Sequence, residues 1–205
     1  MRETAAELLE AWAPACERIE IAGSVRRGKP DPHDIEIVAI PRREILVAER
    51  DMFTDSQITT SERNLLDEML GEWLADDRLR HRLDKNGRPS WGARFKRVTL
   101  WPSGPALDIF SVLPPAQWGV ILAIRTGPAD FSHALVTSRL EGGFLPFGFQ
   151  VKEGSLWVSG HAAPVPLETP QEDDLFREMG LPCWPPSERS VGRLLDWKRE
   201  QRGCG

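Results

Sequence analysis

Two short stretches near the amino terminus, IAGSVRRG at residues 21–28 and DIEIVAI at residues 34–40, decide how the rest of the chain is interpreted. In the second stretch, acidic and branched apolar residues alternate before apolar residues take over, which predicts a strand with one face open at its start. Side chains two residues apart on a strand share a face, so Asp34 and Glu36 point the same way. Like charges this close are costly without a cation between them. The pair therefore predicts a metal ion.

The turn before this strand carries groups that suit phosphate. Gly23 and Gly28 let the backbone approach a ligand closely, and Ser24 offers a hydroxyl. Arg26 and Arg27 offer cationic forks that match phosphate oxygens. The turn lies close enough in sequence to the acidic pair for both to serve one triphosphate. The alternative is a surface turn beside a solvated acidic strand.

A third carboxylate follows in a predicted hairpin, with strands at residues 95–101 and 106–113 and a turn at 102–105 rich in Pro, Ser and Gly. Asp108 is the acid of the second, apolar strand. Because an unpaired buried carboxylate is expensive, we expect Asp108 to face a metal or another cation. An Asp that accepts backbone hydrogen bonds is the alternative.

Positive charge is concentrated beside the first strand of this hairpin, at Arg88, Arg94, Lys96 and Arg97. Such a cluster is typical of a solvated hairpin edge. It is equally typical of a surface that contacts the phosphates of a nucleic-acid strand. Both interpretations remain open from the residues alone.

The remaining pattern mixes helices and strands. Apolar residues at helical spacing predict helices near residues 4–12, 61–79, 114–126, 129–140 and 172–179, the second of them with a cap at residues 60–62. Strands are predicted at 17–21, 144–152 and 156–158. The polar residues that follow Pro41 show no clear strand. The pattern predicts a mixed α+β protein.

Composition narrows the class of protein. The chain has 205 residues, a formal net charge of -5 and three cysteines without metal-ligand spacing. Because the sequence has no long apolar run, we expect no membrane span and no signal peptide. The three cysteines are odd in number and far apart in the sequence, so we interpret them as reduced thiols of a cytoplasmic protein. The acidic balance argues against a generally basic nucleic-acid binder but leaves room for a local basic channel.

These motifs together resemble the nucleotidyltransferases of the DNA polymerase beta type, also called family X polymerases. The Gly-Ser-x-Arg-Arg-Gly turn at 23–28 precedes a carboxylate-x-carboxylate strand, as in that family. Residues 126–132 are similar to its Thr-Gly-Ser-x-x-Phe-Asn segment, and residues 180–186 resemble the Gly-Leu-Pro-aromatic-x-Pro-Pro run of its thumb. The resemblance implies an α+β fold with a palm at 1–127, built on a mixed sheet with helices, and a small α/β thumb at 128–205. Lyase and fingers domains are not expected.

The resemblance also implies roles for individual residues. Two Mg²⁺ ions, or Mn²⁺, are expected at the catalytic and metal-binding residues Asp34, Glu36 and Asp108. Nucleotide contacts are expected from Gly23, Ser24, Arg27, Gly127, Phe131 and Ser132. An ion pair is expected between Arg26 and Glu172. In the family the bond after the Thr-Gly glycine is cis, so we expect a cis peptide bond between Gly127 and Pro128, since proline lowers its cost.

The implied function is template-directed addition of nucleotides to a DNA 3′-hydroxyl, as in short gap-filling repair, by a monomer that binds a nucleoside triphosphate and gapped or primer-template DNA. Several departures keep two alternatives open: a template-independent transferase acting on RNA or a protein acceptor, and a non-catalytic nucleic-acid adaptor. The departures are Glu36 for the usual Asp, Ala106 for an Arg, Ile124 and Arg125 for an aromatic pair, Ser132 for an Asn, and Val136 for an Arg.

Overall fold

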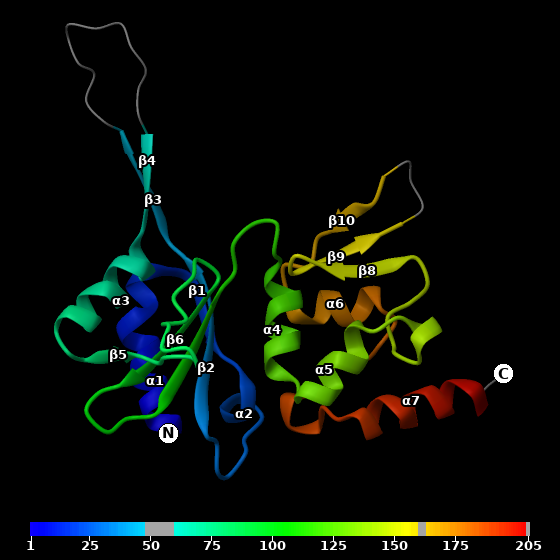
Figure 1. Ribbon diagram of the computed structural model, residues 1–205. Helices are drawn as coiled ribbons and strands as arrows, with labels where there is room; N and C mark the ends of the chain where they lie inside the picture. Colours follow the sequence, from blue (N-terminus) through cyan, green and yellow to red (C-terminus); the bar gives the residue numbers. More distant parts are fainter. Residues whose placement is uncertain (48–59, 160–162, 204–205) are drawn as a thin grey trace, which may run out of the picture.

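The computed structural model describes residues 1–47, 60–159 and 163–203, which fold into a mixed arrangement of helices and strands (Figure 1). The described helices are α1 Arg2–Trp12, α2 Gly23–Arg26, α3 Leu65–Ala75, α4 Trp118–Thr126, α5 Ala129–Val136, α6 Glu172–Glu178 and α7 Val191–Gly203. The described strands are β1 Cys16–Ile21, β2 Asp34–Pro41, β3 Arg43–Val47, β4 Thr60–Asn64, β5 Leu79–His81, β6 Phe95–Leu100, β7 Ala106–Ser111, β8 Phe149–Lys152, β9 Ser155–Val158 and β10 Val165–Leu167. The predicted α+β class is confirmed.

The largest sheet has five strands in the order β1-β2-β7-β6-β5. Strands β2 and β7 run parallel, and the other neighbours run antiparallel, so the sheet is mixed. In the parallel pair Glu36 lies opposite Asp108, and across the antiparallel pair Arg97 of β6 lies opposite Asp108 as well. The register therefore brings acidic and basic side chains together in the middle of one face.

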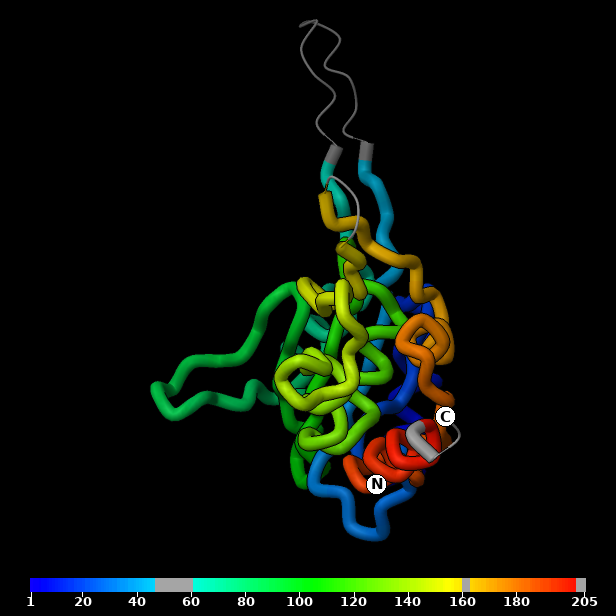
Figure 2. Tube along the Cα trace, turned by 90° about the vertical axis from the view of Figure 1, so that its right-hand side faces the viewer, coloured from blue at the N-terminus to red at the C-terminus, as the bar shows by residue number. Residues whose placement is uncertain are grey.

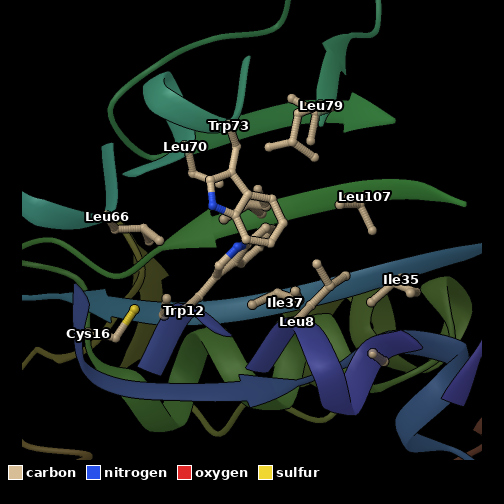
Figure 3. Packing of buried hydrophobic residues seen from close by; sticks show 14 of the residues in the cluster. Leu8, Trp12, Cys16, Ile35, Ile37, Leu66, Leu70, Trp73, Leu79 and Leu107 are labelled. Carbon is tan, nitrogen blue, oxygen red and sulfur yellow. The ribbon is translucent and has the colours of Figure 1, made fainter. Parts of the chain in front are cut away.

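Helices α1 and α3 cover the other face of this sheet (Figure 1). Leu8 and Trp12 of α1 recur at helical spacing and pack against the branched residues of β2 and β7, as Figure 3 shows. Trp12 meets Trp73 of α3 edge to face, with ring centroids 5.5 Å apart. Full burial of such side chains contributes about 1.5–3 kcal/mol each. This cluster fixes the sheet and so fixes the direction of its polar face.

Helix α4 lies between the five-stranded sheet and the C-terminal part of the chain (Figure 1). Trp118 and Leu122 pack against Val38 and Phe110 of the sheet. Val120 and Ala123 belong instead to a separate cluster with α5, α6 and α7. A helix that is apolar on both sides is expected in the interior of a fold. The C-terminal part adds a three-stranded sheet in the order β10-β9-β8.

The region after Pro41 differs from the prediction of no strand. Strands β3 and β4 pair antiparallel from Arg43 opposite Asn64 to Val47 opposite Thr60, and Figure 2 shows them extending away from the body of the molecule. Cross-strand ion pairs such as Arg43 with Glu62 replace the apolar alternation that the sequence lacks. Helix α3 then begins at Leu65, with Asn64 as its cap, because the Asn64 side chain accepts from the Asp67 amide. The predicted cap at residues 60–62 is wrong.

Two further expectations are wrong in detail. The cis peptide bonds of the described residues are Trp101–Pro102 and Pro114–Pro115, so Gly127–Pro128 is trans. Helix α5 ends at Val136 and not at residue 140, because Thr137 leaves the helical conformation and Ser138 caps a short 3-10 helix over Arg139–Glu141. Among the described residues, none of the helices combines the length and the apolar character that crossing a membrane requires.

Candidate functional site

The candidate site is the polar half of the sheet face that looks away from α1 and α3. Ile35, Ile37 and Leu107 point into the core cluster between the sheet and these helices. Because side chains alternate along a strand, Asp34, Glu36 and Asp108 point to the opposite face. The predicted gathering of these carboxylates on one face of β2 and β7 is consistent with the register of the two strands.

The turn at 23–28 is packed directly against this acidic face. Gly23 has φ +60°, and a Cβ at this position would lie 2.8 Å from Cδ of Glu36. The Ala22 amide donates to the Glu36 carbonyl at 2.8 Å. Only glycine tolerates both the left-handed conformation and the contact. Gly23 therefore lets the phosphate-type turn and the acidic strand touch.

Two polar atoms of this turn are buried without a hydrogen-bond partner among the described residues: Oγ of Ser24 and Nε of Arg27. Such groups are costly to leave unsatisfied. Arg27 donates from Nη1 to the Thr126 carbonyl at 2.7 Å, which anchors its guanidinium beside α4. The turn thus holds unused hydrogen-bonding capacity next to the carboxylates.

Asp108 has cationic partners, as its isolation in an apolar strand predicted. Its Oδ1 accepts from Nε of Arg97 at 3.1 Å and from Nη1 of Arg82 at 3.4 Å. Arg97 comes from β6 and Arg82 follows β5, so two adjacent strands supply the two guanidinium groups. Two guanidinium groups thus neutralise the third carboxylate.

Glu36 lies in the most strongly perturbed environment of the site. Burial, followed by the charge of Asp34, raises the pKa of Glu36 to about 7, with Asp108 adding to the rise and Arg125 opposing it. The Arg125 guanidinium lies 3.9 Å from the centre of the Phe110 ring, at the edge of the acidic face. A carboxyl that gives up its charge this easily indicates an excess of negative charge that a cation would relieve.

The donor chemistry of the site fits a hard divalent cation, because Mg²⁺ and Mn²⁺ prefer carboxylate oxygens. Within the described ranges, however, no three His, Cys, Asp or Glu side chains are gathered closely enough to hold a metal ion as they stand. The engagement of Asp108 with Arg97 and Arg82 gives a physical reason, since one of its oxygens is already occupied. The ligands are of the right type, and a metal would have to draw them together.

Arg26 and Glu172 form the ion pair that was expected for them. Nη1 of Arg26 lies 2.8 Å from Oε1 of Glu172 and Nη2 lies 2.9 Å from Oε2, and Nη1 also donates to Oγ1 of Thr126 at 2.7 Å. Arg189, which is buried, donates to the same carboxylate at 2.6 Å. This network ties the turn at 23–28 to α4, α6 and the segment before α7.

The nucleotide contacts expected between residues 127 and 132 fall on side chains and backbone that are buried inside the protein. Phe131 is fully buried in the cluster of the C-terminal part. Ser132 donates its hydroxyl to the Ile124 carbonyl at 2.7 Å. A Cβ on Gly127 would lie 2.6 Å from Phe131, so this glycine serves close packing. We therefore withdraw Phe131 and Ser132 as direct ligand contacts and interpret the segment as support for α4 and α5.

The four predicted nucleic-acid contacts fall into different environments. Lys96 is 1 % exposed and lies 2.7 Å from Asp67, so its ammonium is out of reach of a nucleic-acid backbone, and we withdraw it. Arg94 donates to the Pro114 carbonyl at 2.9 Å. Arg88 is exposed. Arg97 is half-buried and paired with Asp108.

Sequence reasoning missed three arginines that complete the site: Arg82, Arg125 and Arg189. Arg82 lies two residues after Arg80, and this alternation beside a strand was the available signal. Arg125 appeared only as a replacement for an aromatic residue. No local signal marked Arg189, whose partner is distant in sequence.

Comparison with protein-family models finds no match, and none of the curated proteins matches the chain.

Proposed function

We propose that this protein is a nucleotidyltransferase that adds a nucleotide to a DNA 3′-hydroxyl under the direction of a template, as in short gap filling. The observation that carries the proposal is the contact between the turn at 23–28 and Glu36. It places the buried Ser24 hydroxyl, which has no hydrogen-bond partner among the described residues, and the guanidinium of Arg27 beside the carboxylates of the sheet face. A triphosphate and divalent cations are the ligands that such neighbouring groups suit.

Each residue has a chemical role under this proposal. Asp34, Glu36 and Asp108 would hold the magnesium ions, which supply charge neutralisation and activation of a hydroxyl when bound. Ser24 and Arg27 bind the β and γ phosphates and orient them for in-line attack at the α phosphorus. Asp108 takes the hydroxyl proton at its carboxylate. Pyrophosphate is the leaving group.

The architecture supports a division into a palm and a thumb. The five-stranded sheet with α1 and α3 would be the palm, and the part that follows Gly127 would be the thumb. The Arg26–Glu172–Arg189 network fixes the turn to the thumb side. Arg26 is then a structural residue, which leaves Arg27 as the phosphate ligand. A boundary at residue 127 stays a prediction.

The test is single-nucleotide extension on DNA with a one-nucleotide gap, with each deoxynucleotide and ribonucleotide supplied separately and with Mg²⁺ or Mn²⁺. Asp108→Asn should lose activity by at least a hundredfold, because it removes charge compensation for the metal. Asp31→Asn is the matched control, since Asp31 is exposed in the loop between the turn and β2. Normal incorporation by Asp108→Asn would refute the proposal.

A second candidate is transfer without a template to an RNA or protein acceptor. The burial of Phe131 and Ser132 favours it, because these side chains were expected to contact the nucleotide. The exposed Arg125 adds a cation at the edge of the acidic face. Incorporation that ignores the templating base in the same assay would select this candidate. A non-catalytic adaptor would show no metal binding that depends on the carboxylates.

A further inference from the structure

We propose that Arg82 and Arg97 are exchangeable counter-ions of Asp108, which pass to the phosphates of a nucleic-acid strand when Asp108 becomes a metal ligand. The inference rests on the proposed function and adds a coupling between its two partners. Metal binding at the carboxylates and strand binding at the neighbouring arginines would then strengthen each other.

The Asp108 carboxylate is paired with Arg82 and Arg97 through a single oxygen. Both guanidinium groups contact the same oxygen, Oδ1 of Asp108, at 3.1 and 3.4 Å. The Asp108 side chain is 13 % exposed, whereas those of Arg82 and Arg97 are 35 % and 37 % exposed. The arginines can therefore turn outward into solvent without unfolding the sheet, while Asp108 stays in place.

A metal ion and the two guanidinium groups would compete for the Asp108 carboxylate. A divalent cation on Asp108 and two guanidinium groups on its Oδ1 would be like charges within a few ångströms of one another, which is strongly unfavourable in a partly buried site. Binding of the metal therefore requires that the arginines leave. The same pairs explain why the carboxylates are not gathered for a metal in the described part of the chain.

Released Arg82 and Arg97 side chains would lie beside other polar residues of the same sheet face. Arg80 and Thr99 are register partners on β5 and β6, two residues from Arg82 and Arg97, so they share the face that holds Asp108. Arg80 is exposed and its guanidinium lies 3.4 Å from the centre of the Trp101 ring. Strand β5 is an edge of the sheet. Released arginines would join Arg80 in a basic strip at this open edge, where phosphates can bind them.

The consequence is thermodynamic linkage. If a strand binds the released arginines, it frees Asp108 for the metal, and the metal in turn frees the arginines for the strand. The two effects on the dissociation constants must be equal. Coupling of this kind typically changes an affinity by about tenfold.

The experiment measures the affinity of a fluorescein-labelled single-stranded oligodeoxynucleotide by fluorescence anisotropy, first without divalent metal. Asp108→Asn should bind it about tenfold more tightly than wild type, because the arginines lose their internal partner. Asp34→Asn is the matched control: it removes one charge from the same face but has no ion pair with an arginine among the described residues. Its gain should be markedly smaller. In the Arg82→Gln/Arg97→Gln background, Asp108→Asn should bring no gain.

A second arm adds Mn²⁺ and reads its binding by the electron paramagnetic resonance of free Mn²⁺, with the oligonucleotide alone titrated for subtraction. Mn²⁺ should tighten oligonucleotide binding by wild type. The Arg82→Gln/Arg97→Gln variant should bind Mn²⁺ more tightly than wild type, and its Mn²⁺ affinity should not change when the oligonucleotide is added. Equal gains for Asp108→Asn and Asp34→Asn, or weaker Mn²⁺ binding by the arginine variant, would overturn the inference and leave the proposed function standing. If wild type and Asp108→Asn bind Mn²⁺ equally, the proposed metal site fails and the inference fails with it.

Discussion

Replacing Glu172 by Gln tests the network that joins the turn at 23–28 to the C-terminal part of the chain. The carboxylate accepts from two guanidinium groups, and one of them, Arg189, has a side chain that is 1 % exposed. Loss of the charge leaves a buried cation without a counter-ion, and breaking such a pair costs about 3–5 kcal/mol. Because the Gln amide oxygen still accepts one of the hydrogen bonds, we expect a loss of about 3 kcal/mol, or roughly 6–12 °C in Tm.

The pH dependence gives this prediction a second measurement. Burial opposes ionisation, but the hydrogen bonds from Arg189 and Arg26 outweigh it, so the pKa of Glu172 lies below its ordinary value. A depressed carboxyl pKa contributes stability that is present above the unfolded pKa and is lost as the pH falls through the folded pKa. The difference between wild type and Glu172→Gln should therefore hold from neutral pH to about pH 5 and shrink below about pH 4.

Urea denaturation followed by circular dichroism measures both effects. The control is Glu62→Gln, which removes an exposed partner of Arg43 and should cost less than about 0.5 kcal/mol. A double-mutant cycle with Arg26→Gln should show a coupling energy of at least about 1 kcal/mol, since the two side chains are in contact. A loss no larger than that of the control, or one that does not change with pH, would show that the network is not structural.

Three further predictions concern the site itself. In metal-free protein, wild-type stability should fall as the pH rises from about 4.5 to 7, because the pKa of Glu36 is raised to about 7 by burial and then by its acidic neighbours. Glu36→Gln should lack this loss and be roughly 2 kcal/mol more stable than wild type at pH 8, after allowance for solvent screening. Equal urea midpoints of the wild type at pH 5 and pH 8 would contradict the assignment. Gly23→Ala should lose about 1–2 kcal/mol more than Gly87→Ala, because both glycines have positive φ but only the first meets a neighbouring side chain, and equal urea midpoints would disprove the contact. Lys96→Met should lower the free energy of unfolding by about 1–2 kcal/mol and leave oligonucleotide affinity unchanged, whereas Arg88→Gln should weaken that affinity and leave stability unchanged. Weaker binding by Lys96→Met and unchanged binding by Arg88→Gln, measured by fluorescence anisotropy, would show that Lys96 contacts the oligonucleotide.

Local periodicity and turn chemistry were enough to predict much of the secondary structure. Alternation in β2 predicted a strand with Asp34 and Glu36 on one face, and the family resemblance implied that Asp108 of β7 joins them. The register of the two strands is consistent with both predictions. The spacing of apolar residues predicted most helices, although their ends moved where caps such as Asn64 and Ser138 took over. The strands β3 and β4 were missed, because ion pairs across the hairpin leave no apolar alternation to detect.

The partner of each charged side chain became visible once the chain was folded. Lys96 and Arg97 are neighbours in the sequence, yet alternation sends Lys96 into the core beside Asp67 and Arg97 to Asp108 on the opposite face. Arg189 reaches Glu172 from a distant segment, and Arg82 reaches Asp108 from the neighbouring strand. Residue type and spacing fix which chemistry a chain can offer. Which charges neutralise one another depends on the packing of distant elements, because electrostatic partners are chosen by distance and burial in space and not by order along the chain.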